Sequence, residues 1–319
     1  MITVRPFAHT EQDFADMVHI LNATWTDYIE SVAGMRHSFA HRTSGLFAKD
    51  WLIDLDGRPV GYGYLTQMNI PNQNGVYRVD CAVHPDWRGH GAGQAFLETV
   101  TAEITQITPK PTQLMIETRE EQKATTAWLE RLGCVIEMRF PRSTIDVTQF
   151  DKAPFAPLTR KLAAEEIEIK TLEQLAAEDA QAEYKLWELV EYHIRPDMPM
   201  VHEHVIEPFE QAREKRYGHP EHRPDGNFIA LHHGEYVGVS SVWGKEDPNR
   251  LFVGITGTKK TYRRKGIATA LKVKTIEYAQ KHGFSEIETD NEENNPMFDI
   301  NMQLGFTKQP SWLLFKKDL

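Results

Sequence analysis

A basic, glycine-containing loop follows the end of an expected strand at two places in the chain. The loops are Arg88-Gly-His-Gly-Ala-Gly93 and Arg263-Arg-Lys-Gly-Ile-Ala268, and apolar residues at helical spacing follow each of them. The first backbone N–H groups of a helix have no partner within it and lie at the positive end of the helix dipole. The arginine adds a planar cation. Both loops therefore predict a site for an anionic group such as a phosphate.

Two common phosphate motifs do not explain these loops. A dinucleotide-binding fold needs G-x-G-x-x-G directly after its first strand, whereas Gly89-His-Gly-Ala-Gly93 has a different spacing and follows several expected strands. The P-loop pattern G-x-x-x-x-G-K-[ST] does not occur in the sequence. A glycine turn without a ligand would explain one loop equally well, but two loops in matched contexts favour binding.

The surroundings of the loops repeat as well, which predicts a duplicated domain. Four short segments of the first half recur in the same order in the second half. The matched pairs are residues 2–5 with 167–170, 57–61 with 234–238, 83–93 with 258–268, and 132–134 with 304–306. Residues 151–160 contain Pro154 and Pro157 and predict a linker. We therefore expect one domain at 1–150 and another at 161–319.

Each half shows the same order of expected elements. An opening strand precedes a helical segment at 14–28 or 177–192, and a later hairpin turns at Asp56-Gly57 or His233-Gly234. Strands are expected at 51–55, 60–67, 76–83 and 113–118 in the first half, and at 228–231, 236–243, 251–258 and 286–289 in the second. A helix and closing strands complete each half. This order predicts an α/β fold with a mixed sheet.

Composition narrows the class of protein. The chain has 319 residues and a formal net charge of −10, from 36 basic and 46 acidic side chains, which argues against a nucleic-acid partner. A hydrophobic fraction of 40% excludes a disordered chain. Apolar runs are much shorter than the roughly 20 residues of a membrane span, and the opening residues predict a strand rather than an export signal. With Cys81 and Cys134 as its cysteines, the chain cannot form a disulfide scaffold, and we expect a cytoplasmic protein.

The two loops resemble the acyl-CoA signature (Q/R)-x-x-G-x-(G/A) of the GNAT superfamily of N-acetyltransferases. The signature occurs as Arg88-x-x-Gly91-x-Gly93 and as Arg263-x-x-Gly266-x-Ala268. Ala82-Val-His-Pro-Asp-Trp87 is similar to the family's lead-in, and the segment from Asn294 to Leu304-Gly-Phe306 is similar to the end of a GNAT domain. The resemblance covers nearly the whole chain. It implies two tandem GNAT domains, each with a mixed, largely antiparallel central sheet flanked by helices.

The resemblance also implies how an acyl-CoA, acetyl-CoA foremost, would bind as co-substrate. The loop amides would hold the CoA pyrophosphate, the strand end before each loop would pair with the pantetheine arm, and Asn294 would orient that arm. The implied contacts are Cys81, Ala82, Val83, Arg88, Gly89, His90, Gly91, Ala92 and Gly93 in the first domain, and Thr256, Gly257, Thr258, Arg263, Arg264, Lys265, Gly266, Ile267, Ala268 and Asn294 in the second.

The family's catalytic residues cannot be carried over to this sequence. Many relatives have a tyrosine three residues before the Leu-Gly-Phe leucine as the acid for the thiolate, where this chain has Leu129 and Asn301. Some have a glutamate base eleven residues before the loop arginine, where it has Tyr77 and Phe252. The catalytic residues are therefore unknown from the sequence. The weak candidates are Asp80, Glu117, Glu288 and Asn301.

We therefore expect an acyl-CoA-dependent N-acyltransferase that transfers acetyl to a primary amine, by direct attack in a ternary complex. The acceptor is a small-molecule amine or an amino terminus, without a nucleic-acid or membrane partner. The second domain is the expected seat of chemistry, because Asn294 fits the family position that Gln122 occupies in the first half. Two alternatives stay open: a CoA-binding sensor without turnover, and a protein N-acetyltransferase in which one domain only binds.

A metal is not expected, although histidines are frequent. The pairs in His202-Glu-His204, His219-Pro-Glu-His222 and His232-His233 lack the H-E-x-x-H spacing that places two imidazoles on one helix face.

Overall fold

The computed structural model describes residues 1–70, 75–199, 204–244 and 247–319. The chain forms two compact units. Unit 1 comprises Met1–Arg139, Trp312–Leu319 and residues 204–205, and unit 2 comprises the other described residues.

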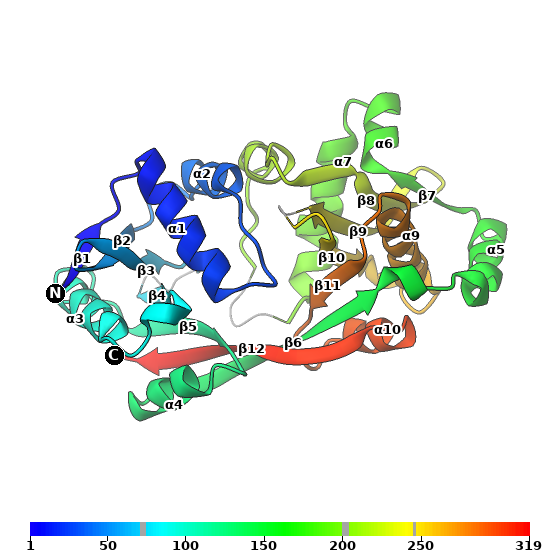
Figure 1. Cartoon of the computed structure of the whole chain (residues 1–319). Helices are drawn as coiled ribbons and strands as arrows, with labels where there is room; N and C mark the ends of the chain where they lie inside the picture. Colours follow the sequence, from blue (N-terminus) through cyan, green and yellow to red (C-terminus); the bar gives the residue numbers. More distant parts are fainter. Residues whose placement is uncertain (71–74, 200–203, 245–246) are drawn as a thin grey trace. The chain divides into compact units, whose positions relative to one another are not determined.

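The elements of unit 1 follow the expected order (Figure 1). They are β1 (Ile2–Pro6), α1 (Glu11–Thr24), α2 (Val32–Ala40), β2 (Ala48–Leu55), β3 (Arg58–Gln67), β4 (Val76–Val83), η1 (Pro85–Trp87), α3 (Ala92–Ile104), β5 (Gln113–Arg119) and α4 (Lys123–Arg131). The sheet order is β1-β2-β3-β4-β5-β12, where β12 is Thr307–Asp318. The β4–β5 pair is parallel and the other pairs are antiparallel.

Unit 2 repeats this plan with a longer helical insertion. Its elements are η2 (Val147–Gln149), η3 (Ala153–Phe155), α5 (Ala156–Ala164), β7 (Ile167–Thr171), α6 (Leu172–Glu178), α7 (Ala182–Glu188), η4 (Leu189–Ile194), η5 (Arg195–Asp197), α8 (Phe209–Ala212), η6 (Arg213–Tyr217), β8 (His222–His232), β9 (Glu235–Gly244), β10 (Arg250–Thr258), η7 (Lys260–Tyr262), α9 (Ile267–Lys281), β11 (Glu286–Asp290) and α10 (Met297–Gln303). The sheet order is β6-β11-β10-β9-β8-β7, where β6 is Val135–Asp146. Only the β10–β11 pair among the described pairs of this unit is parallel. The expected α/β class with a largely antiparallel sheet is confirmed.

The units do not coincide with the segments 1–150 and 161–319, because each half of the sequence contributes the second part of its last strand to the other unit. Residues 142–146 of β6 pair with β11 in unit 2. Residues 312–318 of β12 pair with β5 in unit 1. Each sheet is therefore completed by a segment that is distant in the sequence.

The expected linker 151–160 is largely helical. It forms η3 and the first half of α5. Pro154 and Pro157 lie at the first turns of these helices, where the missing N–H has no helical partner to lose. Leu162 of α5 is buried in the core of unit 2, so this segment is part of the folded unit.

Each sheet buries apolar side chains on both faces. In unit 1, α1 and α2 cover one face with Phe14 and Met17 among others, and α3 covers the opposite face with Phe96 and Val100. In unit 2, α9 covers one face, while α6, α7 and η4 cover the other. The hairpin turns fall where expected, since Asp56-Gly57 and His233-Gly234 all have positive φ.

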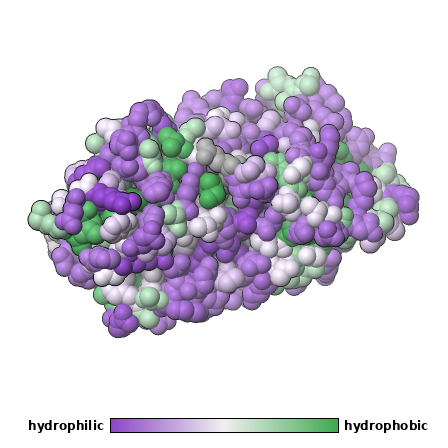
Figure 2. Space-filling model, viewed as in Figure 1, coloured by the Kyte–Doolittle hydropathy of each residue, from purple (hydrophilic) through white to green (hydrophobic). Residues whose placement is uncertain are grey.

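The visible surface is mainly hydrophilic, with small separate hydrophobic patches (Figure 2). Among the described residues, no helix is both long and apolar enough to cross a bilayer.

A lysine side chain is buried in the core of unit 2. Lys272 of α9 is 1% exposed, and its Nζ has no hydrogen-bond partner among the described residues. The Phe306 ring centroid lies 5.6 Å from this Nζ. Burial lowers the pKa of Lys272 to about 7, because the neutral amine loses less hydration than the ammonium.

We predict that Lys272→Met stabilises unit 2, and that its advantage shrinks as the pH rises. Between pH 7 and about 10.4 the unfolded chain holds a proton on Lys272 that the folded chain has lost, so the free energy of unfolding of the parent protein rises with pH in this window. Urea unfolding of both proteins at pH 7, 8 and 9 measures the difference. A difference that is independent of pH would mean that Lys272 keeps an ordinary pKa.

We also predict that two phenylalanines of the C-terminal segment support different units. Phe315 is buried with Leu129 and Cys134 in unit 1, whereas Phe306 is buried in the core of unit 2. Replacing either with alanine should cost about 3–5 kcal/mol. In hydrogen exchange, Phe315→Ala should deprotect α4 and β5, and Phe306→Ala should deprotect α9. If both variants lost protection in the same unit, the assignment of the two ends of β12 to different units would be wrong.

Candidate functional site

In each unit, the parallel strand pair found among the described residues separates after three pairings. β4 and β5 pair through Arg78 and Met115, and β10 and β11 pair through Phe252 and Glu288. Beyond these residues a gap opens between the two strands of each pair. The backbone N–H and C=O groups that face this gap have no partner in the strand ladder and need other hydrogen-bond partners. A loop and a helix follow β4 and β10 directly.

The helix after each gap begins at a glycine with left-handed backbone. Gly91 caps α3 with φ 89°, and Gly266 caps α9 with φ 90°. This conformation suits glycine, which has no Cβ to clash. Neither cap makes a side-chain hydrogen bond, so no capping side chain satisfies the first amides of either helix, as the expected anion site would require.

The loop cations of the two units differ in their partners. Arg88 donates from Nε to the Val83 carbonyl at 3.1 Å and from Nη1 to Gln122 Oε1 at 3.2 Å. In unit 2, the Asp197 carboxylate contacts Arg263 at 2.6 Å and Lys260 at 3.1 Å, and these contacts lower the pKa of Asp197. An anion at the second loop would therefore compete with Asp197.

The strand ends before the loops lie where the sequence placed them. Cys81 is exposed on β4, and Ala82 packs against the α1 side. Thr256–Thr258 end β10, and the Thr256 hydroxyl bonds Ser240 at 2.8 Å. A Cβ at Gly257 would lie 2.4 Å from Ile194, so only glycine fits beside η4.

Four side chains from three strands bridge the gap of unit 1. Asp80 accepts from Arg78 Nε at 2.7 Å, from the Tyr64 hydroxyl, and from the Glu117 backbone N–H at 2.8 Å. Arg78 also pairs with the Glu117 carboxylate. Burial raises the pKa of Glu117. The charge of Arg78 lowers this pKa in part, whereas the charge of Asp80 raises it further. Burial and the Asp80 charge raise the pKa of Tyr64 well above its usual value. The sequence candidates Asp80 and Glu117 are thus brought together.

The gap of unit 2 has a different structure. Glu288 is buried in an ion pair with Arg142, with Nε to Oε1 at 2.6 Å, and Arg250 Nη1 lies 3.4 Å from its other oxygen. Two arginines hold this carboxylate, which suits a structural role better than proton transfer. The register of β10 against β9 shifts between Val253 and Thr256.

This shift is a β-bulge beside the gap. Gly254 and Ile255 lie outside the ladder with β9, and Ile255 N–H donates to the Ser241 hydroxyl at 3.1 Å. A Cβ at Gly254 would lie 2.2 Å from Trp243 Nε1, so the bulge needs glycine for the indole to approach. Bulges commonly turn backbone groups toward active sites.

Aromatic side chains around Trp243 were not predicted from the sequence. The rings of His219 and His222 lie 5.5 and 5.6 Å from that of Trp243. Burial lowers the pKa of His222, and its Nε2 lies 2.6 Å from Asn227 Nδ2. The sequence signal for this cluster was the histidine pair in His219-Pro-Glu-His222. Trp243 lies on the following strand, β9, so its place beside these histidines depends on the fold.

The two asparagines of the second half have separate surroundings. Asn294 is exposed, and its Nδ2 donates to Glu292 Oε1 at 2.8 Å. It does not cap α10, whose N-cap is Pro296. Asn301 is fully buried and donates to Asn291 Oδ1 at 2.7 Å. It therefore has the surroundings of a core residue rather than those of an acid at the gap.

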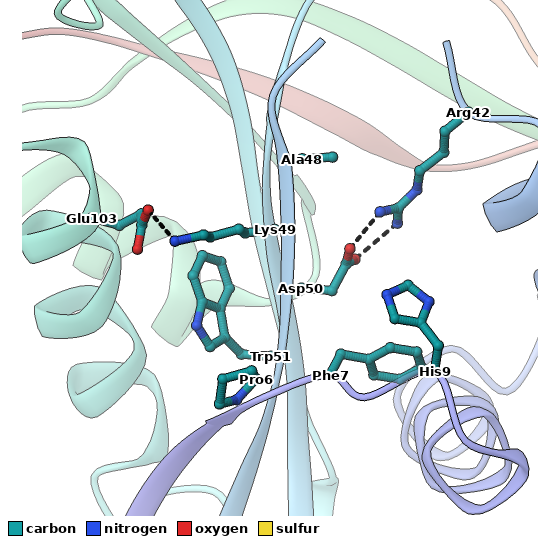
Figure 3. A pocket seen from close by; sticks show the side chains of 9 residues that line it. All are labelled: Pro6, Phe7, His9, Arg42, Ala48, Lys49, Asp50, Trp51 and Glu103. Atoms are coloured by element: carbon teal, nitrogen blue, oxygen red, sulfur yellow. Dashed lines mark hydrogen bonds and ion pairs between the residues drawn. The ribbon is translucent and has the colours of Figure 1, made fainter. Parts of the chain in front are cut away.

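A hollow of about 360 Å³ in unit 1 is lined by residues of β1, β2, α3 and neighbouring connections (Figure 3). Arg42 and Asp50 form an ion pair on one side of it, and Lys49 and Glu103 form another. It contains none of the residues predicted for the site. Among the described residues, no group of three or more His, Cys, Asp or Glu could hold a metal, and His202 of the first histidine pair lies outside them.

Comparisons with known proteins assign the fold and the family. The family model "Acetyltransferase (GNAT) family" matches residues 14–134 and 180–306, and the chain belongs to this family. No curated protein matches the chain.

Solved structures share the tandem fold. A "tandem GNAT protein from the clavulanic acid biosynthesis pathway" aligns with a TM-score of 0.74 at 18% identity, over 100% of this chain and 98% of that one. A GCN5-related N-acetyltransferase from Sphaerobacter thermophilus aligns with a TM-score of 0.67 at 18% identity, over 99% and 95%. These structures support the fold, and the expected tandem GNAT architecture is confirmed.

We predict that the Asp80 carboxylate alone protects the Glu117 amide from exchange with solvent. Asp80→Ala removes the acceptor at 2.8 Å, so the Glu117 N–H should exchange about tenfold faster or more in an NMR measurement. Asp54→Ala, which removes a different carboxylate of the same sheet, is the control. Unchanged exchange in Asp80→Ala would mean that the gap is not bridged by this side chain.

Proposed function

We propose that the protein transfers an acyl group, acetyl foremost, from acyl-CoA to a primary amine, and that unit 2 carries out the transfer. The observation that carries this proposal is the bulge at Gly254 and Ile255, which lies beside the gap of the parallel pair and one loop before the glycine-capped helix α9. A site for the anionic end of CoA and a site for its thioester thus lie along one strand.

The residues present suit the parts of CoA. The first amides of α9, with Lys260 and Arg263, would take the pyrophosphate in exchange for Asp197. Thr256–Thr258 would pair with the pantetheine arm as an added strand. Asn294, on the exposed segment before α10, keeps its proposed contact with that arm.

The reaction needs an amine lone pair and a stabilised oxyanion. A lysine-like ammonium has a pKa of about 10.4, so it must first lose a proton to water or to a base. The nitrogen then attacks the thioester carbonyl, the N–C bond forms, and the C–S bond breaks to release CoA thiolate, which takes up a proton. The Gly254 N–H, which lies outside the ladder with β9, would donate to the carbonyl oxygen.

Unit 1 has a different role in this proposal. Its loop would bind CoA through the first amides of α3, which no capping side chain satisfies, and through Arg88, which has no acidic partner in the described part of the chain. The side chains of Arg78, Asp80 and Glu117 occupy the gap where a thioester would need to lie. This favours the alternative in which one of the two domains only binds, and it assigns that role to unit 1.

Substitutions in the two loops test the assignment. Gly266→Val and Arg263→Ala should reduce thiol release from acetyl-CoA with a panel of primary amines by about tenfold or more, because a branched side chain blocks the approach of the phosphate and the alanine removes a charged donor. Gly91→Val should remove one CoA site in calorimetry and leave turnover largely intact.

Glycines of similar backbone conformation provide matched controls. Gly45 and Gly283 have φ of 80° and 78° with open space around them, so Gly45→Val and Gly283→Val impose the backbone strain alone, away from the loops. A Cβ at Gly266 would also lie 2.5 Å from Leu158 Cδ1, so the melting temperature of Gly266→Val is measured beside its turnover, and Arg263→Ala tests the loop without this clash. Turnover that survives Gly266→Val and Arg263→Ala but is lost in Gly91→Val would place the chemistry in unit 1. Unchanged CoA binding in all loop variants would refute both loop sites.

A further inference from the structure

A buried arginine at the end of β5 has one unused edge. Arg119 is 5% exposed, and its Nη1 lies 2.6 Å from Asp27 Oδ1 and 3.8 Å from Glu121 Oε1. Its Nε and Nη2 are buried and have no hydrogen-bond partner among the described residues. Leaving buried donors of a charged group unpaired is costly, so this edge indicates that an acceptor is missing.

Two indoles form a wall beside the guanidinium. The ring centroids of Trp25 and Trp312 lie 4.9 and 4.6 Å from Arg119 Cζ, and 5.1 Å from each other with an interplanar angle of 61°. Both tryptophans are partly exposed, so solvent reaches the wall above the buried cation. Trp25 directly follows α1 as its C-cap residue, and its backbone N–H donates to the Leu21 carbonyl.

The free edge has the geometry of a carboxylate site. Nε–H and one Nη2–H of a guanidinium point in the same direction and match the two oxygens of a carboxylate. Asp27 and Glu121 at the opposite side disfavour a second negative charge, so a monoanion fits better than a phosphate dianion. The indoles favour a ligand with a flat or apolar body.

We propose that Arg119, Trp25 and Trp312 form a binding site in unit 1 for a small aromatic or apolar monocarboxylate. The site lies on the same face of the sheet as Glu117, because alternate residues of β5 share a face, whereas Ile116 packs with the α3 and α4 clusters. It requires neither CoA nor the transfer reaction in unit 2. Unit 1 would then have two binding sites, one for this carboxylate and one for CoA at its loop.

Calorimetry on the full chain without CoA tests the site with phenylacetate, phenylacetamide and inorganic phosphate. Phenylacetate should bind, while phenylacetamide, which has the same shape without the charge, and phosphate should bind at least about tenfold more weakly. Arg119→Lys keeps the positive charge but loses the planar fork, so it should weaken phenylacetate binding by about tenfold or more. Arg131→Lys, on the exposed surface of α4, is the matched control and should bind like the parent.

The comparison of the three probes stands even if Arg119→Lys fails to fold, which its melting temperature would reveal. Equal binding of phenylacetate and phenylacetamide, tighter binding of phosphate, or no binding of phenylacetate to the parent at millimolar concentration would each overturn the proposal. Unchanged phenylacetate affinity in a folded Arg119→Lys variant would overturn it as well. None of these outcomes depends on acyl transfer, so the proposed function is tested separately.

Discussion

The separation of one parallel strand pair is the constraint on which each unit of this protein depends. After three pairings the two strands diverge, and the backbone groups along the gap must find other partners. In unit 1 the Asp80 carboxylate is one such partner, because it accepts a hydrogen bond from the Glu117 N–H. In unit 2 the strand beside the gap is bulged, and on its other side, toward β9, the Ser241 hydroxyl accepts from the Ile255 N–H. The same fold thus gives one gap that is bridged by side chains and one beside a bulged strand.

The strand exchange makes each unit depend on a distant part of the sequence. β5 has β12 as its neighbour and β11 has β6, so neither sheet is complete within its own half of the chain. Phe315 brings apolar surface to unit 1, and Ile145 brings it to unit 2. The two halves of the repeat are therefore not the two compact units, because part of the last strand of each half lies in the other unit.

Local patterns predicted the local structure well. The strand at 76–83 and the turns at Asp56-Gly57 and His233-Gly234 follow from apolar alternation and turn chemistry, and both are present. The expected helix at 177–192 is interrupted, because Asp179 has extended backbone that ends α6. The residues of the loops could be predicted because they are contiguous. The clusters around Trp243 and Arg119 could not, since they join side chains from separate strands and connections that only the tertiary fold brings together.

The central claim is that acyl transfer takes place at the bulged strand of unit 2. A crystal structure with a non-hydrolysable acetyl-CoA analogue tests it most directly. The account predicts an acyl carbonyl beside Gly254 of β10, the pyrophosphate at the first amides of α9, and Asp197 displaced from Arg263. An acyl group between β4 and β5 against Asp80, with the second loop still closed by Asp197, would contradict it.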